Sequence, residues 1–159
     1  MRPELIHPML VHFPIALLFT GSFIRIAALF TKKKKTYSFL LPASWMILGL
    51  GVIAAWAAII AGEIARDIVA QTLENIQVLN KHDDHAYYTA YAFTLAVLCD
   101  VSRAFLVKQF KKKNLWIKRG IACAIWIFYL FGAYNLVLTG YYGGTLVYEE
   151  GAAVNASKK

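Results

Sequence analysis

The sequence predicts an all-α integral membrane protein, a four-helix bundle with both termini on the outer side of the membrane. Hydrophobic residues make up 59% of the 159-residue chain and the mean hydropathy is positive, which is too apolar for a soluble domain of this length. Four apolar segments each reach the roughly 20 helical residues that cross a hydrocarbon core. Short runs of basic residues separate these segments and set their orientation.

The four spans are placed at residues 8–30, 38–62, 85–107 and 120–140. The runs TKKKK and KQFKKKNLWIKR, which follow the first and third spans, hold ten of the seventeen Lys and Arg residues. The positive-inside rule makes both loops cytoplasmic, and every acidic residue except Asp100 then falls on the opposite side. Both termini therefore face out, and the net charge of +8 is explained without nucleic acid as a partner.

Two segments remain outside the predicted spans. The outer connection, residues 63–84, has apolar residues at roughly helical spacing, which predicts either an amphipathic helix on the membrane surface or a helical extension of the second span. The C-terminal tail, residues 141–159, opens with tyrosines suited to the membrane interface and passes through a Gly-Gly pair typical of a turn. We expect this tail to fold back over the outer mouth of the bundle.

The N-terminal segment and the cysteines add two further expectations. The first apolar segment begins with histidine and proline instead of a basic region and has no small-residue cleavage site after it, so it is expected to stay as a span. Cys99 and Cys123 lie in separate apolar stretches without CxxC spacing. They are predicted to be small buried hydrophobes and not a disulfide or a metal pair.

All four histidines fall on the predicted outer side, although a bilayer disfavours imidazoles. In the stretch IHPMLVHFP, Pro8 suits the first helical position, so His7 is expected just before the helix and His12 one turn inside it. Pro14 leaves a carbonyl one turn earlier without its helical donor, a weakness that a polar side chain or water can satisfy.

One pair of histidines has the spacing of a haem site. His12 on the first span and His85 at the start of the third belong to diagonal helices of an up-down bundle, whose axes lie roughly 14 Å apart. This gap is too wide for a direct contact but suits a haem whose iron takes one imidazole from each side. The pattern therefore predicts a bis-histidine b-type haem near the outer face, beside the small residues Thr89 and Ala92 and flanked by Phe19, Phe23 and Trp56.

Two other interpretations of the histidines stay open. In the motif HDDH, His82 and His85 share a helical face, and with Asp83, Asp84 or His7 they can hold zinc, copper or iron. The plain alternative is that interfacial histidines cap helices and bond to lipid headgroups. Glu63, at the outer end of the second span, is either a carboxylate that orients an imidazole or a solvated helix end.

A haem at this position predicts an electron carrier or a quinol-linked redox subunit, with quinol or a periplasmic redox protein as partner. The inner half of the bundle has no histidine for a second haem, so the redox chemistry is expected at the outer side. The competing hypothesis is a non-haem metal-binding or partner-assembly membrane protein, and a homo-oligomer is compatible with both. No nucleophile–base pair, phosphate loop or nucleotide fingerprint indicates a hydrolase or transferase.

The cytoplasmic end of the bundle carries charges inside the spans. Asp100 and Arg103 are spaced i, i+3 in the third span, and Arg25 lies at a similar depth in the first. An ion-paired latch between helices is the prediction, because charges at such depth need partners.

The chain also resembles a widespread family of bacterial inner-membrane proteins described only as a domain of unknown function. The resemblance rests on IHPMLVHFPIAL, an acidic residue after the glycine that ends span two, a histidine opening span three, and GGTLVYEEGAAV near the end. Members of that family look like four-span proteins, some joined to Rieske or c-type cytochrome domains, which implies electron exchange. Relatives often have a histidine where this chain has Glu150, so a ligand role there does not carry over.

Overall fold

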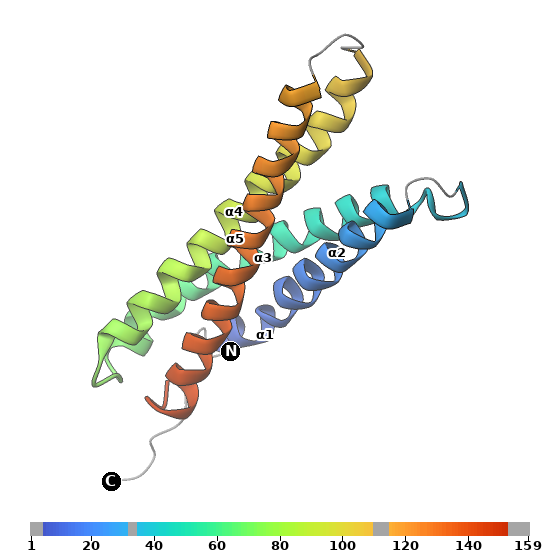
Figure 1. Cartoon of the computed structure of the whole chain (residues 1–159). Coiled ribbons are helices and arrows are strands. Elements are labelled where there is room, and N and C mark those ends of the chain that lie inside the picture. Colours follow the sequence, from blue (N-terminus) through green and yellow to red (C-terminus); the bar gives the residue numbers. More distant parts are fainter. Residues whose placement is uncertain (1–4, 32–34, 110–114, 153–159) are drawn as a thin grey trace.

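The computed structural model describes residues 5–31, 35–109 and 115–152, and within these ranges the regular structure is entirely helical (Figure 1). The elements are α1 (Ile6–Leu10), α2 (His12–Thr31), the short 3-10 helix η2 (Lys35–Tyr37), α3 (Leu40–Ala70), α4 (Ile76–Gln109) and α5 (Leu115–Tyr148). The all-α prediction is confirmed. Within the described residues, three segments are long and apolar enough to cross a membrane: Ile6–Thr31, Lys35–Ala70 and Arg119–Tyr148.

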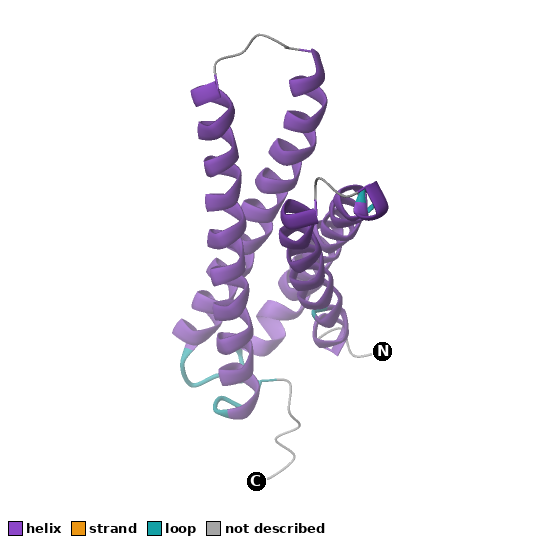
Figure 2. Ribbon diagram, turned by 45° about the vertical axis from the view of Figure 1, so that its right-hand side comes forward, coloured by secondary structure: helices purple, strands orange, loops and turns teal. Residues whose placement is uncertain are grey.

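The four long helices form two antiparallel hairpins. The largest interfaces are α4 with α5 and α2 with α3, while α3 also packs along α4. The hairpins converge at one end of the molecule and diverge toward the other (Figures 1 and 2). We name the first end, with the helix ends at Ile6, Ala70, Ile76 and Tyr148, the terminal end. The opposite end is the loop end. Which membrane face each end occupies stays a prediction.

The structure corrects the predicted outer connection. Residues 63–70 continue α3, so the extension of span two is right and the separate surface helix is wrong. The link between α3 and α4 is only 71–75. It ends where the side-chain oxygen of Asn75 accepts a hydrogen bond from the Gln77 amide at 2.9 Å, and this cap begins α4.

The predicted turn in the C-terminal tail is also wrong within the described residues. Helix α5 runs through Gly143 and Gly144 to Tyr148. It ends because Gly151 takes a left-handed conformation (φ 67°), which lets the Ala152 amide donate back to the Leu146 carbonyl at 2.8 Å. Residues 153–159 of the tail lie outside the described part of the chain.

Small residues set the packing inside the hairpins. A Cβ on Gly21 would lie 2.7 Å from the side chain of Leu48, and one on Gly51 would lie 2.8 Å from Leu18. Each leucine therefore fills the space over a glycine of the other helix, and both leucines are fully buried. Without water to drive association inside a bilayer, this close van der Waals packing holds α2 against α3.

Large apolar side chains cover the outside of the hairpins. Phe23 and Ile53, for example, are 69% and 68% exposed, as expected for residues that face lipid. Cys99 and Cys123 are unpaired as predicted, but both are exposed. Their predicted burial is wrong, because they lie on the outward faces of α4 and α5.

Candidate functional site

An apolar cavity of about 380 Å³ lies at the terminal end, where the two hairpins converge. Its walls come from α1, α2, α3, α4 and α5, and much of the lining is Ala, Gly, Leu, Val or Pro. The volume is within the roughly 300–1,000 Å³ of small-molecule pockets. Three imidazoles, those of His7, His12 and His82, belong to its lining.

His7 is held on α3 by a glycine and a backbone carbonyl. Contrary to the prediction, His7 does not precede the helix: it lies within α1, which ends before Val11. Its Nδ1 lies 2.8 Å from the carbonyl oxygen of Ala58, and a Cβ on Gly62 would lie only 3.0 Å from that nitrogen. A carbonyl oxygen only accepts, so Nδ1 carries the proton and Nε2 keeps its lone pair.

His82 is held on α5 by the same arrangement. Its Nδ1 lies 3.0 Å from the carbonyl oxygen of Thr139, and its ring covers Gly143, whose Cβ would lie 3.2 Å from Cε1. In both cases the accepting carbonyl precedes the glycine by one helical turn, and the missing side chain lets the ring reach it. His82 Nδ1 therefore donates as well, and Nε2 again keeps its lone pair.

The two imidazoles meet across the hairpins. Their ring centroids are 5.9 Å apart with the ring planes at 87°. Burial, followed by the nearby His7, lowers the pKa of His82 from 6.5 to about 4, so its ring is neutral near pH 7. Two rings with Nδ1 tied to a backbone carbonyl match the way proteins orient metal-bound histidines.

A charged pair stands beside the imidazoles. The Nε of Arg66 on α3 lies 3.0 Å from Oδ2 of Asp83 on α4, and another Arg66 nitrogen donates to Oδ1 of Asn80 at 2.5 Å. Both Arg66 and Asp83 line the cavity. Burial raises the pKa of Asp83 to about 6 despite the opposing effect of Arg66.

Of the predicted haem residues, His12 and Thr89 line the cavity and His85 is not among the lining residues. The His85 ring donates from Nδ1 to Oδ1 of Asn135 at 2.7 Å and stacks on Tyr142, with centroids 5.5 Å apart. The amide of Asn135 is fixed because its Nδ2 donates to the Phe131 carbonyl. A ligand role for His85 thus stays a prediction.

The aromatic residues predicted around the haem, and Ala92, lie elsewhere in the bundle. Phe19 and Trp56 are partly buried and pack against the central core. Ala92 is buried at the close approach of α4 to α5, 3.3 Å from where a Cβ on Gly132 would lie. Phe23 points away from the protein core and is largely exposed.

The predicted metal cage from HDDH does not form as a cluster. Within the part of the chain that the structure describes, no group of three or more His, Cys, Asp or Glu side chains is arranged to hold a metal ion. Asp83 pairs with Arg66, and Asp84 is exposed. Glu63 accepts a hydrogen bond from the Tyr87 hydroxyl at 3.1 Å, so its contact is with a phenol and not with an imidazole.

The predicted latch forms between Arg25 and Asp100. Both are buried, with Arg25 Nε 2.5 Å from Oδ2 and a second guanidinium nitrogen 3.0 Å from Oδ1. This bidentate pair joins α2 to α4 nearer the loop end, and Trp45 of α3 donates to the same carboxylate at 3.1 Å. Arg103 is not a partner of Asp100 in any of these contacts.

The sequence placed His7 together with His82 only in the alternative metal site, and not as a pair of haem ligands. The sequence signal for this pair is a glycine on each facing helix. Gly62 and Gly143 each lie one helical turn after the residue whose carbonyl accepts the imidazole hydrogen bond. Read along the sequence, Gly62 marks a helix end and Gly143 begins a turn. Only the packing of the helices shows that each glycine makes room for a ring.

The fold and the cavity together define a polytopic α-helical membrane protein with an apolar, histidine-lined pocket at one end. The family model described as "Predicted membrane protein (DUF2231)" matches residues 3–156, and the chain belongs to this family. The resemblance seen in the sequence is thereby confirmed. No curated protein and no solved structure matches the chain.

Proposed function

We propose that this membrane protein binds one b-type haem in the apolar cavity through His7 and His82, and serves as an electron carrier or quinol-linked redox subunit. The observation that carries the proposal is the matched pair of imidazoles, one from each hairpin, each with Nδ1 tied to a backbone carbonyl and Nε2 left as the nitrogen that can bind a metal. When bound, haem supplies one-electron exchange.

The number of donors favours haem over a bare metal ion. Zinc takes three or four protein ligands, whereas a haem iron already has four ring nitrogens and takes only axial ligands from the protein. The described residues bring two imidazoles together but no group of three or more ligands. The apolar walls with Gly140 and Gly144, where an added Cβ would meet open space, also suit a flat apolar group.

The proposed setting is the outer face of a bacterial inner membrane, with quinol in the bilayer or a periplasmic redox protein as electron partner. The distribution of basic residues supports this orientation, because in the sequence both basic runs lie next to helix ends, Thr31 and Gln109, that belong to the loop end. The histidine pocket then faces outward. A non-haem metal held by His7 and His82 alone, with its other ligands from outside the described residues, is the second candidate, since both histidines line the cavity.

The test is haem titration of the detergent-purified protein, followed by visible spectra before and after dithionite reduction and by metal analysis. We expect a low-spin b-type spectrum that is lost in His7→Ala and His82→Ala and kept in the matched controls His12→Ala and His85→Ala. Loss only in the two control variants would return the site to the pair predicted from the sequence. A colourless protein that holds zinc or copper would replace the haem by the non-haem metal.

A further inference from the structure

A second polar site lies around the buried ion pair, on the opposite side of the core from the histidine pocket. All four long helices contribute to it: Arg25 from α2, Trp45 from α3, Asp100 from α4, and Trp126 with Tyr129 from α5. The Arg25 guanidinium lies over the Trp126 ring, 5.2 Å from its centroid, and Trp126 contacts Tyr129. None of these side chains lines the histidine cavity.

Two buried donor atoms beside this ion pair lack a hydrogen-bond partner within the described residues. They are Oγ of Ser22 and Nε of Arg103, whereas the Tyr129 hydroxyl has the Asp100 carboxylate as a nearby acceptor. Ser22 stands one helical turn from Arg25, and Arg103 one turn from Asp100, so each lies on the same helix face as a member of the pair. Buried polar groups are nearly always satisfied, so donors left over at one place indicate a missing acceptor.

The charges at this place have the sign that an anion requires. Asp100 neutralises Arg25 through a bidentate contact and also accepts from Trp45, and within the described residues no carboxylate forms an ion pair with Arg103. An arginine inside a membrane protein is costly unless it meets an acceptor or an anion. The unpartnered Nε shows that the described protein does not supply one for that nitrogen.

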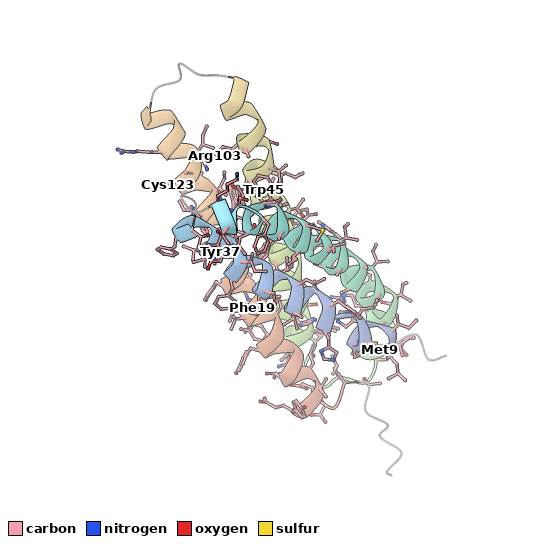
Figure 3. The ribbon with its side chains drawn as sticks, turned by 90° about the vertical axis from the view of Figure 1, so that its right-hand side faces the viewer. Met9, Phe19, Tyr37, Trp45, Arg103 and Cys123 are labelled. Carbon is pink, nitrogen blue, oxygen red and sulfur yellow. The ribbon has the colours of Figure 1, made fainter. Side chains whose placement is uncertain are left out.

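We propose that this site binds the phosphate of an anionic phospholipid between the two hairpins, through Arg103 with Ser22. The helices diverge toward the loop end, as Figures 1 and 2 show, and Figure 3 places Arg103 and Trp45 away from Met9, which marks the terminal end. Basic pockets between helices on the cytoplasmic side are where anionic headgroups bind. In the sequence, lysine runs adjoin the helix ends at Thr31 and Gln109, which belong to this end.

The experiment compares lipid retention by native mass spectrometry after reconstitution with phosphatidylglycerol or with phosphatidylcholine. We expect the wild type to retain phosphatidylglycerol preferentially and Arg103→Gln to lose this preference, with an affinity lower by about tenfold or more. Arg103→Lys keeps the charge and is expected to retain most of the binding. Lys35→Gln removes one exposed charge at the same end and is the matched control, expected to bind like the wild type.

Two further results decide the proposal. Ser22→Ala removes one donor without changing the charge, and we expect weaker retention in a protein whose helicity is unchanged by circular dichroism. Equal retention of both lipids by the wild type, or unaltered preference in a folded Arg103→Gln variant, would overturn the proposal. Binding of inorganic phosphate alone with the same affinity as the lipid would assign the site to a soluble anion and also overturn it.

Discussion

Gly62→Ala isolates the contact that holds His7 in place. The added Cβ would lie 3.0 Å from Nδ1 and 3.1 Å from Cε1 of the ring, closer than ordinary van der Waals contact. A retreat of the ring by about 0.4 Å relieves the contact, but it stretches the 2.8 Å hydrogen bond to the Ala58 carbonyl toward about 3.2 Å, where such bonds weaken. The ring then loses its fixed orientation.

The magnitude follows from two opposing effects. Alanine favours a helix over glycine by about 1 kcal/mol, while a weakened neutral hydrogen bond costs about 0.5–1.5 kcal/mol. The free energy of unfolding of Gly62→Ala should therefore stay close to that of the wild type. Affinity for the proposed haem should fall by roughly 10- to 100-fold, the usual effect of disturbing an outer contact of a metal ligand.

Gly49→Ala is the matched control, because it lies on the same helix and an added Cβ meets nothing within 4 Å. It should raise the unfolding temperature and leave haem titration unchanged. Nitrogen NMR of the His7 ring gives a readout that needs no ligand, since Gly62→Ala should shift the population protonated at Nδ1. Identical ring tautomers and identical haem affinity in Gly62→Ala, Gly49→Ala and the wild type would refute the reasoning.

Two further predictions concern the buried charges and the pH dependence of the ligand-free protein. Arg25→Leu should lower the free energy of unfolding by about 3–5 kcal/mol, because it leaves the Asp100 carboxylate buried without its partner. The double variant Arg25→Leu/Asp100→Leu should recover much of this loss. Chemical denaturation measures both free energies. An additive double variant would contradict this. Because the pKa of His82 falls from 6.5 to about 4 on folding, the unfolded chain binds more protons in that window and stability should drop on acidification from pH 6.5 toward 4. The pKa of Asp83 is raised to about 6 in the folded protein, so between pH 6 and 3.8 the folded state binds more protons at this residue and acidification stabilises it. Asp83→Asn removes this stabilisation and should steepen the acid-induced fall in unfolding temperature. An unchanged slope would count against this account.

Several features of the site follow from the sequence because they depend on residue type and local spacing. Imidazoles and charges are unfavourable in a bilayer wherever they occur, so hydropathy and residue type alone make His7, His12 and His82 candidates. They also predict that Asp100 pairs with an arginine, Arg25 or Arg103. His7, His12 and His82 line one cavity, and Arg25 does bind Asp100. Spacing along the chain does not decide which of the four histidines come together.

The predicted pair of His12 and His85 assumes diagonal helices at a fixed separation in a regular bundle. The hairpins instead converge at one end and diverge at the other (Figure 2), so the distance between facing residues changes with depth. The ring of His85 is hydrogen-bonded to Asn135 and stacked on Tyr142, both from α5. The sequence could not show these contacts, because both residues are 50 or more positions away from His85.

The sequence by itself determined the membrane class, the helical fold, the family and the set of titratable residues, because hydropathy, charge placement and a local motif are properties of contiguous segments. Tertiary structure alone decided which imidazoles meet. That choice depends on Gly62 and Gly143, whose missing side chains let a ring from another helix reach a backbone carbonyl. In a sequence, glycine usually indicates a helix end or a turn. Only the packing of a neighbouring helix shows that these two glycines make room for an imidazole ring.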